Sequence, residues 1–236
     1  MIFPHHSHMP TLSYEQIVRD LRKCSSTEKA KHMAKYLKTS DLEFYGLKLP
    51  DIHKITKSYA KNMDIDELRH NMIRLWELPI FETRRAAINF MTKFARKGNV
   101  EVAIRIASTW IEDIDTWALV DPLCSPCIGI MLLRNWNLTR TLESWHNSPN
   151  YWRRRASFLP YLYLALKKAY KPEYTEIILG AVLPHISDEE FFVGKAVGWV
   201  LRELSKRNPD AVRQFIREYK NKMTKLVIRE GSKKLE

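Results

Sequence analysis

Glycine is scarce in this chain, with only seven among 236 residues. No segment shows the sustained alternation of apolar and polar residues that is typical of a half-buried strand. Apolar residues recur instead at intervals of three and four, as they do along an amphipathic helix. The sequence therefore predicts an all-α protein.

Cysteine is also rare: three residues cannot build a disulfide framework and suit a reducing cytoplasm. Cys124 and Cys127 form a C-x-x-C, but it lacks a second ligand pair for zinc and lies in an apolar helical stretch. We interpret them as buried thiols. Three histidines near the N-terminus could catch a metal, although flexible histidines near a terminus usually have no function: His5, His6 and His8.

Several catalytic signatures are missing. There is no G-x-G-x-x-G, no P-loop, no G-x-S-x-G and no H-E-x-x-H or His/Asp cluster. We therefore expect no cofactor and no metal, so that any chemistry uses side chains alone. No apolar run approaches the roughly 18–20 residues of a membrane span, and the N-terminus does not read as a signal peptide. We expect no membrane association and a cytoplasmic location.

Positive charge, in contrast, is abundant. Lys and Arg number 39 against 27 Asp and Glu, which gives a formal net charge of +12. Such an excess favours a polyanionic partner, because phosphates release counterions when Lys and Arg neutralise them. Charge alone fits a merely basic protein equally well.

Helical periodicity and Pro/Gly punctuation predict a series of short helices. The expected ranges are 27–38, 50–62, 65–77, 80–97, 99–112, 117–133, 138–147, 151–170, 173–184, 188–207 and 209–220. Pairs of helices recur at roughly 35–45 residues, which indicates a HEAT-like helical-repeat solenoid with a concave basic face. A plain helical bundle is the alternative. We expect 1–12 to be a flexible N-terminal segment and 13–236 a single domain.

The segment from about Ser187 to Arg207 has two distinct faces. One face is apolar and should be core: Val193, Val197, Val200 and Leu204. The other is basic with a central aromatic: Lys195, Trp199, Arg202 and Lys206. Gly194 and Gly198 stand one turn apart around Trp199, and each costs about 1 kcal/mol in a helix interior. Tight helix packing and close approach of a ligand backbone explain them equally well.

Trp117 and Asp121 lie four residues apart, so one helical turn would place both on the same face. Asp121 also precedes Pro122, and Asp-Pro is a common pair at a helix start, which makes a capping role the alternative. For Trp117 taken alone, the alternative is a place in the core.

Three motifs resemble one known family. They are Trp117-x-x-x-Asp121, Trp152-x-x-Arg155-Ala156 and the stretch from Phe191 to Glu203, with Asn208-Pro209 following. From about residue 27 to 220 the chain resembles the AlkD-like DNA alkylation repair glycosylases. Ala118 departs from the pattern, because relatives often carry an acid there.

This resemblance implies a monofunctional glycosylase that excises purines alkylated at N3 or N7 from duplex DNA. Trp117 and Trp199 would flank the sugar of the damaged nucleotide, and Asp121 would sit at its anomeric carbon. Arg155 would hold the backbone phosphate. Further DNA contacts are expected from basic and aromatic positions: Arg84, Arg85, Trp152, Arg153, Arg154, Lys195, Arg202 and Lys206. We expect a monomer that associates with the nucleoid when bound to DNA.

The chemistry agrees with this expectation. Alkylation at N3 or N7 leaves the purine cationic, so it departs without a general acid, while a carboxylate and indole faces stabilise the sugar cation. One alternative is a catalytically inactive relative that binds bent or branched DNA. A second is a protein-interaction scaffold without nucleic acid.

Overall fold

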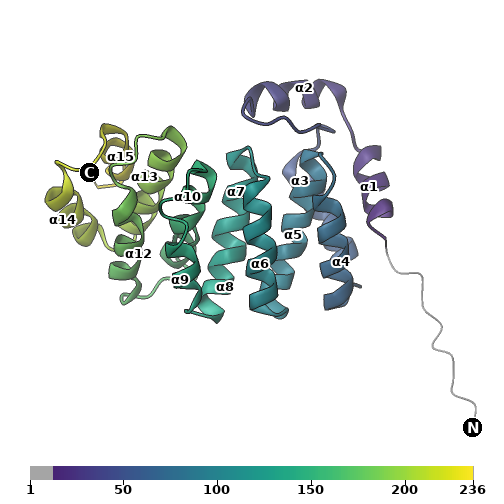
Figure 1. Cartoon of the computed structure of the whole chain (residues 1–236). Coiled ribbons are helices and arrows are strands. Elements are labelled where there is room, and N and C mark those ends of the chain that lie inside the picture. Colours follow the sequence, from purple (N-terminus) through teal and green to yellow (C-terminus); the bar gives the residue numbers. More distant parts are fainter. Residues whose placement is uncertain (1–12, 236) are drawn as a thin grey trace, which may run out of the picture. The chain divides into compact units, whose positions relative to one another are not determined.

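The computed structural model describes residues 13–235, and their secondary structure is helical apart from one isolated bridge between Glu43 and Ile80 (Figure 1). The prediction of an all-α protein is confirmed. The segment 1–12, with its three histidines, lies outside the described residues.

The chain divides into two compact units with their boundary between Lys97 and Gly98. The N-terminal unit contains α1 (Tyr14–Lys23), α2 (Thr27–Tyr36), α3 (Leu49–Ala60), α4 (Ile65–Trp76) and α5 (Phe81–Lys97). The C-terminal unit contains α6 (Val100–Glu112), α7 (Trp117–Pro122), α8 (Gly129–Arg134), α9 (Leu138–Glu143), α10 (Tyr151–Phe158), α11 (Leu162–Ala165), α12 (Tyr174–Val182), α13 (Phe191–Ser205), α14 (Pro209–Tyr219) and α15 (Lys225–Gly231). Sequence periodicity predicted neither α1 nor α15. A single domain over 13–236 stays a prediction beside this division.

In the N-terminal unit, one buried carboxylate fixes the turn that leads into α3. Glu82 on α5 accepts hydrogen bonds from the backbone N–H groups of Tyr45, Gly46 and Leu47 at 2.9, 2.8 and 3.1 Å. Gly46 has a φ of 83°, and a Cβ there would lie 2.2 Å from the carbonyl oxygen of Ser26. This turn therefore needs glycine for both its conformation and its space.

In the C-terminal unit, helix continues from Trp117 to Arg134 but changes type in the middle. Leu123–Ile128 is π-helical between α7 and α8. Pro126 has no N–H for the carbonyl of Pro122 four residues earlier, and the Cys127 thiol donates to that carbonyl at 3.5 Å. The prolines are thus accommodated by a change of helix type.

The run Trp117–Arg134 has a mean hydropathy of 1.3. By length and composition alone it could cross a membrane. The expectation that no run approaches such a length is therefore wrong. Since 61% of the run is buried inside the structure, its apolar residues serve as core. Cys124 and Cys127 are fully buried free thiols within it, as predicted.

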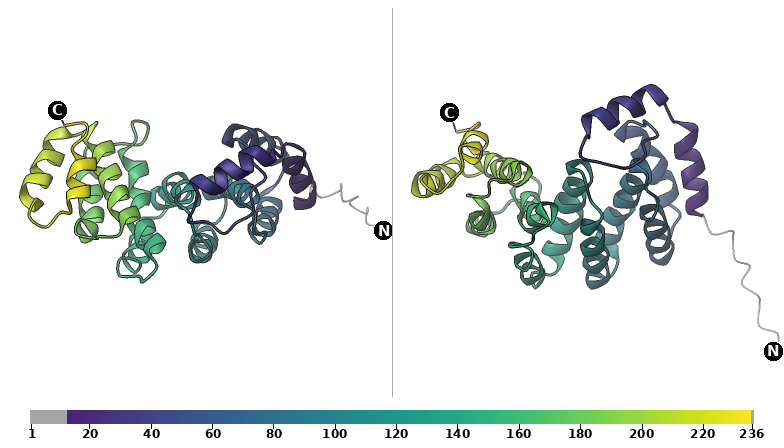
Figure 2. Two further views of the ribbon diagram at one scale, coloured as in Figure 1. Left: turned by 90° about the horizontal axis from the view of Figure 1, so that it is seen from above. Right: turned by 45° about the horizontal axis from the view of Figure 1, so that its top comes forward.

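α13 is the central helix of the C-terminal unit. Its predicted core residues are all fully buried: Val193, Val197, Val200 and Leu204. α15, yellow in Figures 1 and 2, packs along α13, green. A Cβ on Gly198 would lie 2.3 Å from Cβ of Glu230, and one on Gly194 would lie 3.1 Å from Cδ2 of Leu226. Of the two explanations for these glycines, tight helix packing is the one that the structure supports.

Candidate active site

A cavity of about 220 Å³ opens among α7, α10 and α13 of the C-terminal unit. Its lining residues are Trp117, Arg155, Phe191, Phe192, Lys195, Trp199 and Arg202. Five of the residues predicted from the sequence therefore meet here, although they come from three helices. The two indoles and three cations give it aromatic walls and a positive potential, which suits an anionic ligand with a polarisable or cationic part.

Asp121 belongs to this site through Arg155. Nε of Arg155 donates to Oδ1 of Asp121 at 2.9 Å, and Nη2 donates to Oδ2 at 2.9 Å. Nη1 of Arg155 donates to the backbone carbonyl of Phe192 at the start of α13. One guanidinium thus joins α7, α10 and α13, and fixes the carboxylate beside the cavity through a two-pronged contact.

The start of α7 explains how Asp121 comes to face α10. The hydroxyl of Thr116 accepts a hydrogen bond from the N–H of Ala118 at 3.3 Å and caps the helix. Asp121 therefore lies one turn inside α7, on the same face as Trp117, and does not cap a helix that starts at Pro122. The alternative capping role of Asp121 is excluded by this arrangement.

Burial shapes the electrostatics of the pair. The side chain of Arg155 is 5% exposed and that of Asp121 is 15% exposed. Burial raises the pKa of Asp121 above its ordinary value of 3.8, and the neighbouring Arg155 guanidinium opposes that rise. Burial, with the charge of Asp121 nearby, also raises the pKa of the Cys124 thiol well above its ordinary value of 9.0. Cys124 therefore stays protonated beside the pair.

The arrangement adds a contact to the role expected for Arg155. The resemblance implied a grip on a backbone phosphate, but three of its five N–H donors already serve Asp121 and Phe192. In this structure Arg155 holds Asp121, and two of its donors remain for a further partner. Its contact with a backbone phosphate stays a prediction. The two oxygens of Asp121 each keep a lone pair outside the Arg155 contact, because a carboxylate has about four.

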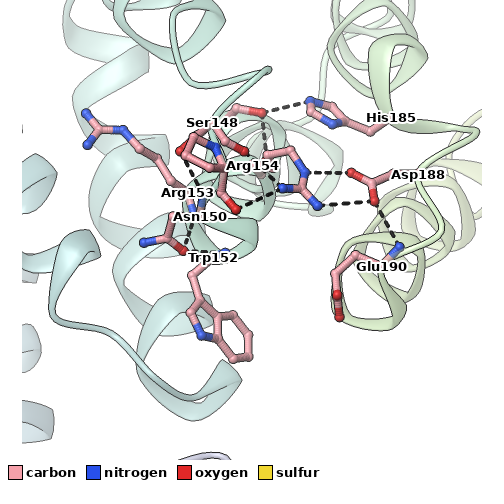
Figure 3. Close-up of polar contacts among 10 residues, drawn as sticks. Ser148, Asn150, Trp152, Arg153, Arg154, His185, Asp188 and Glu190 are labelled. Atoms are coloured by element: carbon pink, nitrogen blue, oxygen red, sulfur yellow. Dashed lines mark hydrogen bonds and ion pairs between the residues drawn. The ribbon is translucent and has the colours of Figure 1, made fainter.

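Two neighbours of Arg155 on α10 have structural contacts instead of open surfaces. Trp152 is 4% exposed, and its ring centroid lies 4.8 Å from that of Phe192. Arg154 donates to Asp188 at 2.8 Å through Nε and to the carbonyl of Ser148 at 2.9 Å through Nη1 (Figure 3). In this structure Trp152 packs in the interior, and Arg154 ties α10 to the loop before α13. Their contacts with DNA stay predictions.

The remaining predicted DNA contacts lie outside the lining of the cavity. Arg153 pairs with Glu112 and lies over the ring of Trp145 at 5.2 Å, pointing away from Arg154 in Figure 3. Lys206 pairs with Glu203 at 2.6 Å. Their contacts with DNA stay predictions.

Arg84 and Arg85 belong to the N-terminal unit. Arg84 donates to the carbonyl of Leu78 at 3.3 Å and lies 5.0 Å over the ring of Trp76, while Arg85 donates to Asn89 at 3.0 Å. Their contacts with DNA also stay predictions.

Three residues of the site were not singled out from the sequence. Phe191 and Phe192 line the cavity, and Phe191 is 54% exposed at its edge. Glu230 on α15 forms ion pairs with Lys195 and Arg202. The two phenylalanines stood in the matching motif and could have been found there. Glu230 gave no such signal, because it stands as one acid in a basic C-terminal segment.

Comparisons with known proteins agree with the fold. A structure described as a predicted DNA alkylation repair enzyme from Enterococcus faecalis shares 24% identity and a TM-score of 0.75, over 89% of this chain and 96% of that one. AlkD2 from Streptococcus mutans shares 16% identity and a TM-score of 0.68, over 95% and 100%. A Streptococcus mutans UA159 protein shares 15% identity and a TM-score of 0.65, over 94% and 99%. These similarities place the chain among helical repeat proteins.

The curated proteins give no match. The family model of the DNA alkylation repair enzymes matches residues 17–235, which is almost all of the described chain and includes every helix around the cavity. The chain therefore belongs to the DNA alkylation repair enzyme family.

Proposed function

We propose that this protein is a monofunctional DNA glycosylase that hydrolyses the N-glycosidic bond of cationic N3- or N7-alkylated purines in duplex DNA. The observation that carries the proposal is the Asp121–Arg155 pair at a cavity lined by Trp117 and Trp199. Membership of a DNA alkylation repair family supports DNA as the substrate.

The lesion supplies most of the leaving-group activation. A purine alkylated at N3 or N7 carries a positive charge, so when the bond between C1′ and the base nitrogen breaks, both electrons neutralise the departing base. Positive charge develops on the deoxyribose at the same time. The site needs to stabilise that sugar cation and to direct water, and it does not need an acid that protonates the base.

Asp121 performs the first task. Its carboxylate is mostly buried, where an opposite charge is stabilised more strongly than in water. A water molecule bound by the outer lone pairs of Asp121 attacks C1′, and its proton passes to the carboxylate and then to solvent. Arg155 holds Asp121 in one orientation throughout, which lowers the cost of assembling the reacting groups.

The aromatic and basic residues of the cavity hold the damaged strand. The indole faces of Trp117 and Trp199 attract the sugar cation by about 1–2 kcal/mol when water is displaced. Lys195 and Arg202 line the same cavity, and we assign them to the backbone phosphates beside the lesion. The substrate is thus bound by its sugar and backbone, and the base itself needs no specific pocket.

The test is release of free base from methylated duplex DNA. We expect the purified protein to release 7-methylguanine or 3-methyladenine, detected by mass spectrometry, and to leave apurinic sites without strand cleavage. Undamaged duplex and a heated enzyme sample are the controls. No release of either base would refute the proposed activity.

If no base is released, binding to duplex DNA at several salt concentrations separates the two alternatives. Tight, salt-dependent binding to duplex without base release would favour an inactive relative that binds bent or branched DNA. Absence of salt-dependent duplex binding would favour a protein-interaction scaffold, since neutralising phosphates imposes a steep dependence on salt.

A further inference from the structure

Glu230 is a carboxylate in the interface between α15 and α13. Glu230 is 3% exposed, and its Cβ lies so close to Gly198 that any side chain at position 198 would collide with it. Burying a carboxylate is costly unless partners satisfy it. The contacts around it therefore decide what this interface does.

Four cations surround this one carboxylate. Oε1 of Glu230 lies 3.2 Å from Nζ of Lys195 and 3.4 Å from Nε of Arg229. Oε2 lies 3.1 Å from Nη1 of Arg202 and 2.7 Å from Nζ of Lys233. Contacts with Lys233 and Lys195 outweigh burial and lower the pKa of Glu230 to about 2, so it stays ionised. We call these five residues the Glu230 cluster.

The cluster carries more positive charge than Glu230 neutralises: four cations against one carboxylate leave an excess of three. One lysine would suffice to pair a single buried carboxylate. Each cation also has several N–H donors and gives only part of them to Glu230. The cluster therefore keeps both charge and hydrogen-bond donors for an anion.

The Glu230 cluster extends from the cavity to the protein surface. Lys195 and Arg202 line the cavity, whereas Arg229 and Lys233 belong to α15 and its C-terminal end and are 67% and 47% exposed. Both pairs contact the same carboxylate, so the four cations gather around one point. A group of cations that begins in a cavity and continues onto the surface suits the phosphates of a nucleic-acid strand.

We propose that the Glu230 cluster is a phosphate-binding site for the DNA backbone, which extends the active-site cavity onto α15. Glu230 is its positioning residue, holding Lys195 and Arg202 at the cavity and Arg229 and Lys233 beyond it. This inference rests on the proposed function for the identity of the strand, but it concerns binding and can be tested without base release.

The first experiment measures binding of a short, undamaged duplex by fluorescence anisotropy at several salt concentrations. We expect Arg229→Gln and Lys233→Gln each to weaken binding about 3- to 10-fold at low salt and to reduce the salt slope by about 0.9. Arg213→Gln is the matched control, because Arg213 is a similarly exposed arginine on α14 that pairs with Asp210. We expect it to retain the wild-type slope. Wild-type slopes in both cluster variants would overturn the proposal.

The second experiment separates positioning from simple charge. Glu230→Gln removes a negative charge beside the strand, so we expect undamaged duplex to bind at least as tightly as to the wild type. Single-turnover base excision should nevertheless fall at least about 10-fold, because Lys195 and Arg202 lose their common anchor. Parallel losses of affinity and rate would assign Glu230 a merely structural role and contradict the positioning claim.

The outcomes remain distinguishable from failure of the proposed function. Arg229 and Lys233 are exposed, so their variants are expected to fold even if Glu230→Gln does not, and thermal melting checks each protein. Reduced salt slopes with no base release by the wild type would retain the phosphate site and refute the glycosylase. Base release with unchanged slopes would do the reverse.

Discussion

Arg155 holds both carboxylate oxygens of Asp121, with Nε 2.9 Å from Oδ1 and Nη2 2.9 Å from Oδ2. A second pair of the same kind lies nearby: Arg154 holds Asp188 through Nε at 2.8 Å and Nη2 at 3.4 Å. The side chains of Asp121 and Asp188 are equally exposed, at 15%. Of these four residues only Arg155 lines the cavity, so the second pair provides a control for the first.

The contact of the Arg155 guanidinium with both oxygens of Asp121 leads to the first prediction. Arg155→Lys keeps the charge but cannot contact both oxygens of Asp121 and the carbonyl of Phe192 at once. We expect single-turnover excision to fall by about 10- to 100-fold, since small displacements of a reacting group are this costly. Arg154→Lys is the control on the same helix, and we expect it to stay within a few-fold of wild type. Equal rates for both variants would show that the two-point contact between Arg155 and Asp121 has no role in catalysis.

The pKa of Asp121 leads to the second prediction. Because burial raises it above 3.8, and because only the ionised carboxylate stabilises the sugar cation, excision should decline as pH falls through that raised pKa. The pH profile of the single-turnover rate measures the midpoint. We expect it above 3.8, and a rate that stays flat down to that pH would contradict the assigned role. Folding at each pH is checked by circular dichroism.

The two glycine environments in helices α12 and α13 lead to the third prediction. A Cβ at position 198 would lie 2.3 Å from Cβ of Glu230, whereas one at position 180 would meet nothing within 4 Å. We expect Gly198→Ala to lower the free energy of unfolding by about 1–3 kcal/mol through overpacking. Gly180→Ala should raise it by about 0.5–1 kcal/mol, because alanine favours helix. Urea denaturation measures both, and equal effects would contradict the packing of α15 on α13.

A buried histidine leads to the fourth prediction. His185 accepts or donates a hydrogen bond with the Ser157 hydroxyl at 2.9 Å. Burial, reinforced by His146, lowers its pKa from 6.5 to about 4. As pH falls from 6.5 towards 4, the unfolded chain takes up a proton that the folded chain refuses, so stability is full above 6.5 and is lost below it.

The expected loss is about 3 kcal/mol across that window, and protonation of the folded state ends it near pH 4. His185→Gln removes the titrating group, so the difference between the two proteins should shrink as pH falls. Parallel stability curves for wild type and variant between pH 6.5 and 4.5 would show that His185 does not carry the effect. Carboxylates that titrate in the same range affect both proteins alike.

Much of the fold followed from the sequence. Spacing of three and four predicted most helices, and the apolar residues of α13 were identified correctly because one helix face carries them all. Thr116 and Asn150 cap α7 and α10 as expected of such residues. α15 was missed, because its three apolar residues are consecutive and show no spacing of three or four.

The site could be predicted only in part, because its key contacts join distant residues. Trp117, Asp121 and Trp199 stood in recognisable motifs, yet nothing local indicated that Arg155 would pair with Asp121, 34 residues away. The basic face around Trp199 likewise predicted a surface for DNA. It did not indicate that the carboxylate of Glu230 pairs with its basic residues. Glu230 reaches Lys195 and Arg202 only because Gly198 lets α15 approach α13, and such an approach depends on tertiary packing.

The most direct measurement compares Asp121→Asn with Asp188→Asn in single-turnover release of 7-methylguanine or 3-methyladenine from methylated duplex. Both changes remove one carboxylate charge from an arginine pair, at aspartate side chains of the same exposure, and melting temperatures report any loss of stability. We predict that Asp121→Asn slows release on the order of 100-fold or more, while Asp188→Asn stays within a few-fold of wild type. Equal rates for the two variants would contradict a catalytic role for Asp121, and with it the central claim.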